Sequence, residues 1–352
     1  MKLFLTELLT IGAIVAAVPS PAQTYTIQDL GLAPGTTYPL AQGLNDVGQA
    51  CGFCESPNGP VATFSSDGQV IVLAPTNPKD IASAKGIDNA GDVVGYEMPD
   101  KAPINTARAL IWSNGGKAQD ITSTSIFSGG EEALAVSKVS GEVVGIGFTS
   151  APINNEWHMF TYANGRTVDL GPSTASGEPI AINDSGVMLV NFTNGTQAIF
   201  SNGTFTPIAQ PPNATATANA LNNSGVVVGE IDYSTNTIAP HAGLYRNGVW
   251  TDLGTLAGAA RGTRAVGINS SGQIIGLAEG KLITKPTTQI PDISCILQNG
   301  TWVELNSLIP ANSGFNLNLS VPVAINDAGQ ILIDIKTSSG NYVRNVLLTP
   351  TQ

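Results

Sequence analysis

The sequence predicts an all-β protein in which seven four-stranded antiparallel sheets close into one ring, and three observations support this prediction. A motif of the form A-x-A-I-N-x-x-G-x-V-V-G recurs seven times in the 352 residues. Each copy is followed by two more strand-like segments that meet at an Asn-Gly or equivalent turn. The last copy has a third strand but no fourth, whereas an unpaired fourth-strand segment stands before the first copy.

The repeated motif has the pattern of a β-hairpin. Its A-x-A-I part alternates with the period of two that a strand requires. Asn-x-x-Gly is turn chemistry in which glycine supplies a positive φ, and V-V-G begins the returning strand. The turn glycines are Gly48, Gly91, Gly141, Gly186, Gly225, Gly272 and Gly329.

Two further strands complete each repeat. The third strand is clearest in residues 160–165 (FTYANG), and the fourth is clearest in residues 250–254 (WTDLG). Four antiparallel strands every roughly 40–50 residues are typical of one blade of a β-propeller. An open β-solenoid is the alternative arrangement.

The spacing of the repeats sets the number of blades. The turn glycines lie about 47 residues apart, and seven repeats of that length account for residues 23–352. Residues 25–31 then supply the missing fourth strand of the last blade, whose third strand is residues 343–348. This pairing removes the exposed sheet edges of a linear array. The prediction is therefore a single domain, residues 23–352, folded as a seven-bladed β-propeller.

The first 22 residues have the features of a secretory signal peptide. Lys2 gives a positive start, residues 8–18 form an apolar run, and Ser20 and Ala22 are the small residues expected at a cleavage site. The run is too short for a membrane-spanning helix, which needs about 20 residues. We therefore expect a secreted or periplasmic protein with no membrane span, and a membrane-tethered N-terminus is the alternative.

The strand ends of the repeat carry a resemblance to a known family. The x-A-F-x-Y-x-N-G and W-x-D-L-G patterns resemble the HAF-repeat family of bacterial extracellular proteins. Degraded forms of the tripeptide that names the family stand at residues 158–160 (HMF) and 241–243 (HAG), and residues 252–258 (DLGTLAG) are especially similar. The resemblance covers essentially all of residues 23–352. It implies a secreted β-propeller, and it transfers no catalytic residues because the family has no established common activity.

Composition excludes several classes of function. Lys and Arg number 15 against 26 Asp and Glu, and the net charge of −11 argues against a nucleic-acid partner. Three cysteines are too few for a disulfide framework. Cys51 and Cys54 lie three apart on a predicted strand, which puts their side chains on opposite faces. We expect Cys51, Cys54 and Cys295 to be buried small residues, and one disulfide stays open as a possibility.

Position within the repeat tests each candidate catalytic group. His158 and His241 fall at the same place in different blades, at the start of a third strand, so they do not predict a metal site or a catalytic pair. The fourth-strand acids occupy another repeated position, and we expect them to bond locally or to a neighbouring blade. These acids are Asp29, Asp120, Asp169, Asp252 and Glu304. No cofactor and no metal are predicted.

The blade layout nevertheless points to one face. The 1–2 and 3–4 turns are uniformly tight and share a face, whereas the 2–3 and 4–1 connections share the other face and vary in length. Variable loops on a rigid scaffold are where binding sites tend to lie. We predict a binding or interaction module, most simply a monomer, with a carbohydrate, cell-surface or protein ligand at the variable-loop face and the channel mouth. The predicted ligand-binding residues are Tyr96, Trp157, Tyr233, Asp232, Arg261 and Arg264.

Two alternatives compete with this prediction. The first is a polysaccharide hydrolase or lyase, which would need two carboxylates facing each other at about 5–10 Å across the mouth. The candidates are Glu131, Glu132, Glu178 and Glu230. The second is a structural domain without a small-molecule site. The binding module is preferred because no constellation of nucleophile, base and acid stands outside the repeat.

Overall fold

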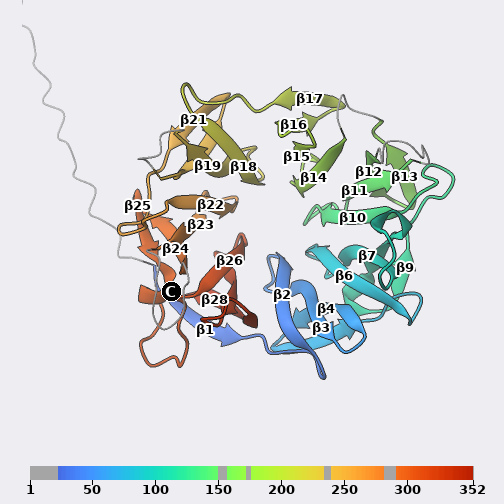
Figure 1. Ribbon diagram of the computed structural model, residues 1–352, viewed down its shortest axis with the longest axis horizontal. Helices are drawn as coiled ribbons and strands as arrows, with labels where there is room; N and C mark the ends of the chain where they lie inside the picture. The colour runs from blue at the N-terminus through green and yellow to red at the C-terminus, as the bar shows by residue number, and fades with distance from the viewer. Residues whose placement is uncertain (1–22, 150–156, 172–175, 234–238, 281–290, 352) are drawn as a thin grey trace, which may run out of the picture.

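The computed structural model describes residues 23–149, 157–171, 176–233, 239–280 and 291–351. The predicted signal peptide therefore lies outside the described residues, as do parts of four 2–3 or 4–1 connections. Twenty-eight strands form seven four-stranded antiparallel sheets arranged around a central opening (Figure 1). The predicted seven-bladed β-propeller is thus confirmed.

Blades 1 to 6 are each made of four consecutive strands. Blade 1 comprises β2 (Thr37–Leu44), β3 (Ala50–Ser56), β4 (Gly59–Ser66) and β5 (Gln69–Leu73). Blade 2 comprises β6 (Asp80–Ile87), β7 (Val93–Pro99), β8 (Arg108–Trp112) and β9 (Ala118–Asp120). Blade 3 comprises β10 (Glu131–Val136), β11 (Val143–Phe148), β12 (Trp157–Ala163) and β13 (Arg166–Asp169).

The second half of the ring repeats this order. Blade 4 comprises β14 (Gly177–Ile182), β15 (Met188–Phe192), β16 (Gln197–Ser201) and β17 (Thr204–Pro207). Blade 5 comprises β18 (Thr215–Leu221), β19 (Val227–Asp232), β20 (His241–Arg246) and β21 (Val249–Asp252). Blade 6 comprises β22 (Thr263–Ile268), β23 (Ile274–Glu279), β24 (Asp292–Gln298) and β25 (Thr301–Glu304).

Blade 7 closes the ring with strands from both ends of the described chain. It comprises β26 (Ser320–Ile325), β27 (Ile331–Lys336), β28 (Tyr342–Pro350) and β1 (Tyr25–Asp29). β1 pairs antiparallel with β28, with Tyr25 opposite Pro350 and Asp29 opposite Val346. The predicted closure by the N-terminal strand is therefore confirmed, and no blade carries an unfilled fourth position.

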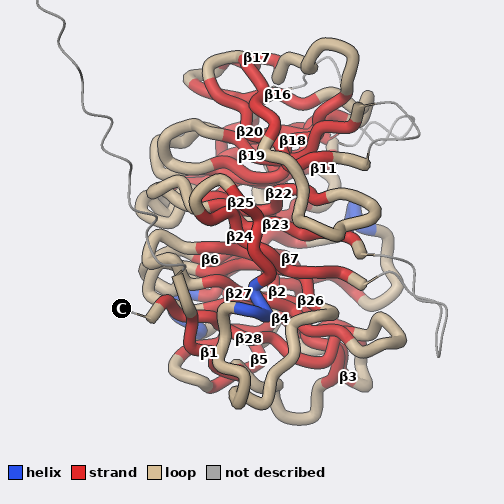
Figure 2. Tube along the Cα trace, turned by 90° about the vertical axis from the view of Figure 1, so that its left-hand side faces the viewer, coloured by secondary structure: helices blue, strands red, loops and turns tan. Residues whose placement is uncertain are grey.

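Helix is confined to short turns in the part of the chain that the structure describes. These turns are η1 (Ile104–Thr106), η2 (Ser113–Gly115) and η3 (Leu305–Ser307). No helix among the described residues has the length and apolar character needed to cross a membrane. Seen edge-on, the strands run across the disc while loops and turns gather at its two faces (Figure 2).

The core is divided among the interfaces between blades. Each of the seven hydrophobic clusters joins side chains of two neighbouring blades; for example, Met159 of β12 packs with Met188 of β15. A single blade cannot bury its faces alone, so stacking around the ring supplies the core. All four tryptophans donate their indole N–H to a backbone carbonyl of another segment, such as Trp302 to Leu253 at 2.9 Å. Their apolar rings and single donors therefore join blades together.

The tight turns have the predicted chemistry. The seven motif glycines all have φ between 67° and 85°. Six blades join their third and fourth strands through Asn-Gly, or Asp-Gly in blade 1, with both residues at positive φ. Such turns match the twist of antiparallel strands. The face that carries these turns is named the tight-turn face, and the opposite face is named the loop face.

A ring of amide hydrogen bonds joins the blades on the tight-turn face. The motif asparagine closes its own hairpin through Oδ1, as when Asn222 accepts from Ser224 and Val226 at 3.0 Å each. Its Nδ2 donates to the backbone carbonyl of the next motif residue, as when Asn222 donates to Asn269 at 3.0 Å. Asn45, Asn183, Asn269 and Asn326 bond in the same way. Asp88 and Ser137 replace asparagine in blades 2 and 3, where the backbone N–H of Asn89 bonds the Lys138 carbonyl instead.

Candidate functional site

A β-bulge in every inner strand shapes the central channel. The pairing of the first and second strands skips one residue at the same place in each blade, for instance between Ala84 and Gly86. The skipped residue is the variable x of A-x-A-I. These residues are Gln42, Lys85, Leu134, Ile180, Asn219, Val266 and Val323. A bulge leaves one residue unpaired and re-aims its side chain, which simple strand alternation does not predict.

The bulge also explains the glycine of V-V-G. In five blades this glycine is paired with the first alanine of the motif, as Gly229 is with Ala218. A Cβ on Gly229 would lie 1.8 Å from the Thr217 carbonyl oxygen, and four of the five glycines face a backbone oxygen within 2.0 Å. In blades 4 and 7 proline replaces the alanine, and Val190 and Ile333 replace the glycine. The alanine and glycine therefore change together.

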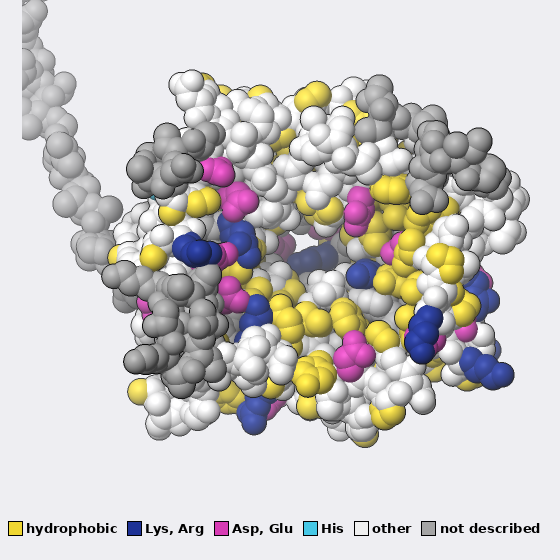
Figure 3. Space-filling view, in the orientation of Figure 1, with side chains coloured by type: hydrophobic (Ala, Val, Ile, Leu, Met, Phe, Trp, Pro, Cys, Tyr) yellow, Lys and Arg dark blue, Asp and Glu magenta, His cyan; other side chains and the backbone are white. Residues whose placement is uncertain are grey.

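One step closer to the loop face, the repeat loses its uniformity. The cross-strand pairs at this level are named the mouth rung. They are Leu40–Phe53, Ser83–Tyr96, Glu132–Ile146, Glu178–Asn191, Thr217–Glu230, Arg264–Leu277 and Val321–Asp334. Charged, aromatic and apolar side chains alternate here, next to an alanine–glycine level that scarcely varies. Figure 3 shows acidic and basic side chains around the central opening of this face.

Blades 2, 3 and 4 contribute the first group of mouth residues. Glu132 is only 8% exposed, and burial raises the pKa of its carboxyl to about 7. Lys85 of β6 lowers that pKa, whereas the nearby charge of Glu178 from β14 raises it. The ammonium of Lys85 lies 5.6 Å from the ring centre of Tyr96, and burial followed by the charge of Glu132 raises the pKa of that tyrosine. Four side chains from three blades thus interact at one side of the mouth.

Blades 5 and 6 contribute the second group. Burial raises the pKa of Glu230, Arg264 lowers it, and Asp232 and Glu279 raise it further. Arg264 Nη1 lies 3.3 Å from Glu279 Oε1 in a half-exposed ion pair. The exposed Arg261 donates its backbone N–H to the Glu279 carbonyl at 3.1 Å. This group contains three carboxylates and the Arg264 guanidinium, and Arg261 contacts it through its backbone.

Three of the predicted site residues lie away from the mouth. Glu131 is fully buried, where Oε1 accepts from the Ser123 backbone N–H at 2.5 Å and Oε2 has no partner. Burial raises its pKa to about 7. Because strand neighbours point to opposite faces, Glu131 is directed away from Glu132 and holds the 4–1 loop of its blade.

Trp157 and Tyr233 are also engaged elsewhere. Trp157 donates its indole N–H to the Gly177 carbonyl at 3.2 Å and packs on Phe148, so it joins blades 3 and 4. Tyr233 donates its hydroxyl to Asp252 on the outer strand at 2.5 Å, and this bond raises its pKa to about 12. These contacts cannot be predicted from the sequence, since both residues stand beside variable loops.

The four predicted carboxylates therefore do not form one group. Glu132 and Glu178 interact with each other, Glu230 belongs to the second group of mouth residues, and Glu131 is covered. Sequence reasoning did not select Lys85, Asn191 or Asp334. Asp334 is 2% exposed, with its pKa raised by burial to about 7, and it accepts the Ala41 backbone N–H of blade 1 at 3.3 Å. The available signal for Asn191 and Asp334 was the position after V-V-G or its equivalent, which differs in every blade, and for Lys85 it was the variable x of A-x-A-I.

The repeated acids pair with histidine or arginine side chains between the third and fourth strands of their blades. His158 Nδ1 lies 2.9 Å from Asp169, and His241 Nδ1 lies 2.8 Å from Asp252. Arg344 makes the equivalent contact with Asp29 at 3.0 Å. Asp29, Asp120, Asp169 and Asp252 also accept a backbone N–H two residues ahead, which explains the recurring D-L-G. The expectation of local bonding is confirmed for these four acids.

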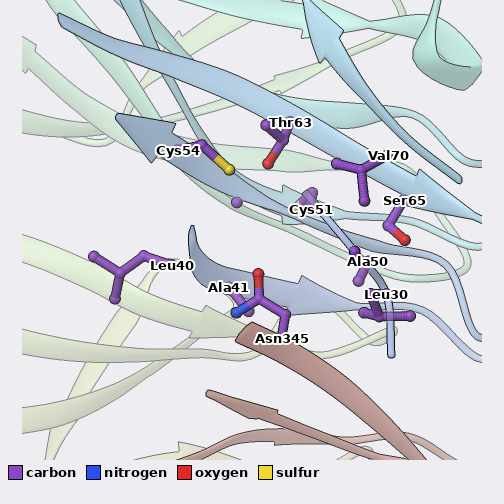
Figure 4. A pocket seen from close by; sticks show the side chains of 12 residues that line it. Leu30, Leu40, Ala41, Ala50, Cys51, Cys54, Thr63, Ser65, Val70 and Asn345 are labelled. Carbon is purple, nitrogen blue, oxygen red and sulfur yellow. The ribbon is translucent and has the colours of Figure 1, made fainter. Parts of the chain in front are cut away.

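The three cysteines are buried and free. Cys51 contacts Gly43 and packs toward blade 2, whereas Cys54 bonds Thr36 and Thr63, so the two thiols point to opposite faces. Beside them lies a cavity of about 20 Å³ between blade 1 and Asn345 of blade 7 (Figure 4). A space of that size holds about one water molecule. No group of His, Cys, Asp and Glu suited to a metal ion occurs among the described residues.

Comparisons with known proteins agree with this architecture. No family model matches the sequence, and no curated protein matches it significantly. The acylaminoacyl peptidase of Pyrococcus horikoshii is similar in structure, with a TM-score of 0.52 and 9% identity, over 90% of this chain and 52% of that chain. This chain thus spans about half the length of that peptidase.

Two polysaccharide lyases also appear among similar structures. Lyase Uly1 has a TM-score of 0.49 at 8% identity, over 86% of this chain and 88% of its own. The PL25 ulvan lyase, solved bound to -[GlcA(1-4)Rha3S]-, has a TM-score of 0.45 at 11% identity, over 94% and 96%. At such identities the likeness concerns the β-propeller fold alone.

Proposed function

We propose that this protein is an exported β-propeller binding module whose ligand engages the loop-face mouth of the central channel. The mouth rung carries the proposal. Seven blades share one hairpin motif, yet at this level they present Tyr96, Glu132, Glu178, Glu230 and Arg264 in unequal surroundings. A purely structural ring has no need for such different charged and aromatic side chains beside an alanine–glycine level that scarcely varies. The signal-like residues 1–22 and the resemblance to HAF-repeat proteins support export.

The ion pairs and carboxylates of the mouth also favour binding over a structural role. Packing between blades needs few buried charges, and burying a carboxylate without a full set of partners costs stability. The charges in this protein make up only 12% of residues. Several of them nevertheless surround one opening, where a ligand that supplies their missing partners would offset the unfavourable free energy of burying them.

The proposal is tested by screening ligands against matched variants. The wild-type protein is screened against glycan and peptide arrays and in peptidoglycan pull-downs. Glu230→Gln/Asp232→Asn removes two mouth charges, and Glu142→Gln/Asp67→Asn removes two charges on the tight-turn face. We expect the mouth variant to weaken binding by roughly tenfold or more and the control to bind as wild type. Equal binding by both variants, or no binding to any surface, would overturn the proposal.

A polysaccharide-acting enzyme is the second candidate, and one observation favours it. Glu132, with a pKa raised to about 7, stands beside Glu178, whose charge contributes to that shift. A carboxyl whose pKa is raised, with a second carboxyl nearby, is the arrangement of a general acid and its partner. Incubation with anionic and neutral polysaccharides, followed by measurement of chain length, tests this candidate. Cleavage that persists in Glu132→Gln would exclude the pair as its cause.

A further inference from the structure

Glu132 is a largely buried carboxylate that accepts no hydrogen bond from the described residues of the protein. It is 8% exposed, and no hydrogen bond or ion pair to its carboxylate occurs among the described residues. This contrasts with Glu97 in blade 2, which is fully buried but accepts from the Thr76 backbone N–H at 2.5 Å and is paired with Arg108. A buried ionisable group without donors is costly. Glu132 therefore has acceptor capacity that the protein itself does not use.

The surroundings of Glu132 indicate which kind of ligand group would bind its carboxylate. Glu178, exposed on β14, brings a second negative charge from one side, and Lys85 and Tyr96 stand on the other side. The Lys85 ammonium lies 5.6 Å from the Tyr96 ring centre. Ammonium groups are attracted to aromatic faces at about this distance. The protein thus already places one ammonium over this ring with its own lysine.

We propose that Tyr96, Glu132 and Glu178, named the amine pocket, bind an ammonium or guanidinium group of the ligand at the channel mouth. The inference rests on the proposed function and adds the chemical class of the ligand, a basic peptide or another polyamine. A cation supplies donors to Glu132, offsets the repulsion between the two carboxylates and meets the Tyr96 ring. Lys85 acts as the internal competitor that the ligand group displaces.

A neutral sugar fits these observations less well. Sugar hydroxyls donate hydrogen bonds, but they do not relieve the repulsion between Glu132 and Glu178. The far side of the mouth has the same sign, since Glu230, Asp232 and Glu279 outnumber Arg264 in that group. Acidic groups on both sides attract a ligand that carries several positive charges.

The state of Glu132 supplies a second signature. Lys85, Tyr96 and Glu178 are the titratable groups that face it, and its pKa of about 7 leaves it partly protonated at neutral pH. A bound cation favours the ionised carboxylate. Binding of a cation should therefore release protons near pH 7 and weaken as the pH falls below 6.

The test uses titration calorimetry of the protein with oligolysine and oligoarginine peptides, and with fully N-acetylated oligolysine as the uncharged probe. Glu132→Gln is expected to weaken binding roughly tenfold or more. Lys85→Met is expected to tighten it severalfold, because the internal competitor is gone. Glu142→Gln, on the tight-turn face, is the matched control. Thermal unfolding and circular dichroism check that each variant is folded.

The opposite effects of Glu132→Gln and Lys85→Met separate this inference from a structural role. Equal weakening by both substitutions, or unchanged binding by acetylated oligolysine, would overturn it. If a neutral glycan binds and is lost in Glu230→Gln/Asp232→Asn but not in Glu132→Gln, the amine pocket is wrong and the proposed function stands. If neither peptides nor glycans bind the wild-type protein, both fail.

Discussion

The two faces of the ring use the same strands for different purposes. On the tight-turn face, the motif asparagines repeat one pair of bonds, and Asp46 gathers donors from Asn89, Asp327 and Lys138. On the loop face, Glu131, Glu132 and Glu230 are partly or wholly buried and accept few hydrogen bonds from the described residues, whereas the buried Asp334 accepts from Ala41 and Asn345. The pKa of Asp46 is lowered even though its partial burial opposes that shift, whereas burial raises the pKa of Glu131, Glu132, Glu230 and Asp334. Two acids depart from this contrast, since burial raises the pKa of Asp88 on the tight-turn face and Glu97 on the loop face is paired with Arg108.

The alanine–glycine level lies between these faces. A substitution of its glycine should have the largest effect on the free energy of unfolding. Gly229→Ala places a methyl group 1.8 Å from the Thr217 carbonyl oxygen, which only a backbone shift can relieve. We expect a loss of about 3 kcal/mol or more in the free energy of unfolding, measured by urea denaturation. Gly225→Ala is the control: φ is +73° with open space around it, so about 1 kcal/mol is expected. Similar losses in the two variants would contradict the role given to the bulge.

The amide ring should tolerate less change than the mouth. Asn222→Ala removes the acceptor for Ser224 and Val226 and the donor to Asn269 at a buried position, and a loss of about 2–3 kcal/mol is expected. Asp88→Asn should act in the opposite direction. It supplies the missing amide donor in blade 2 and removes a carboxylate whose pKa burial raises, so a gain of about 1 kcal/mol at pH 7 is expected. A destabilised Asp88→Asn protein would show that blade 2 bonds differently.

The pH dependence of stability distinguishes the loop-face acids. The folded-state pKa of Glu131 is about 7, above its ordinary 4.5. The folded protein therefore holds this proton more tightly than the unfolded chain, and stability present below pH 4.5 is lost as the pH rises through 7. Glu131→Gln should lose less unfolding free energy between pH 4.5 and 8 than wild type does, by roughly 2–3 kcal/mol. Urea denaturation at both pH values measures this, and parallel profiles would contradict it.

An exposed mouth residue should matter least to folding. Glu178 is exposed on β14, so Glu178→Gln should change the free energy of unfolding by at most about 0.5 kcal/mol. It removes a like charge near Glu132 and should bring the pKa of Glu132 closer to its ordinary value. Carboxyl titration followed by NMR, with thermal unfolding in parallel, checks both expectations. A pKa of Glu132 that does not move would show that the two carboxylates are independent.

The sequence predicts the ring because each hairpin motif shows its strands and its turn, and the number and spacing of the motifs give the number of blades. The motif glycines, the Asn-Gly turns and the unpaired strand at residues 25–31 are local signals, and all reappear in the structure. The bulge is harder to predict, because A-x-A-I has the pattern of a regular strand. The one local signal is that proline replaces the alanine where valine replaces the glycine, as in the pair Pro179–Val190. The direction of side chains beside loops is not encoded locally. Glu131 and Glu132 have almost identical sequence environments, yet they face opposite sides of one strand.

The strand pair β1–β28 joins the two ends of the described chain. Blades 1 to 6 form from consecutive strands with short-range contacts, whereas the seventh needs Tyr25 and Pro350 together. Pairings between distant parts of a chain raise contact order and slow folding. Closure of the ring therefore depends on a strand pairing between opposite ends of the described chain. A truncation within β28 removes the shared partner of β1 and β27 and leaves two unpaired strand edges in blade 7.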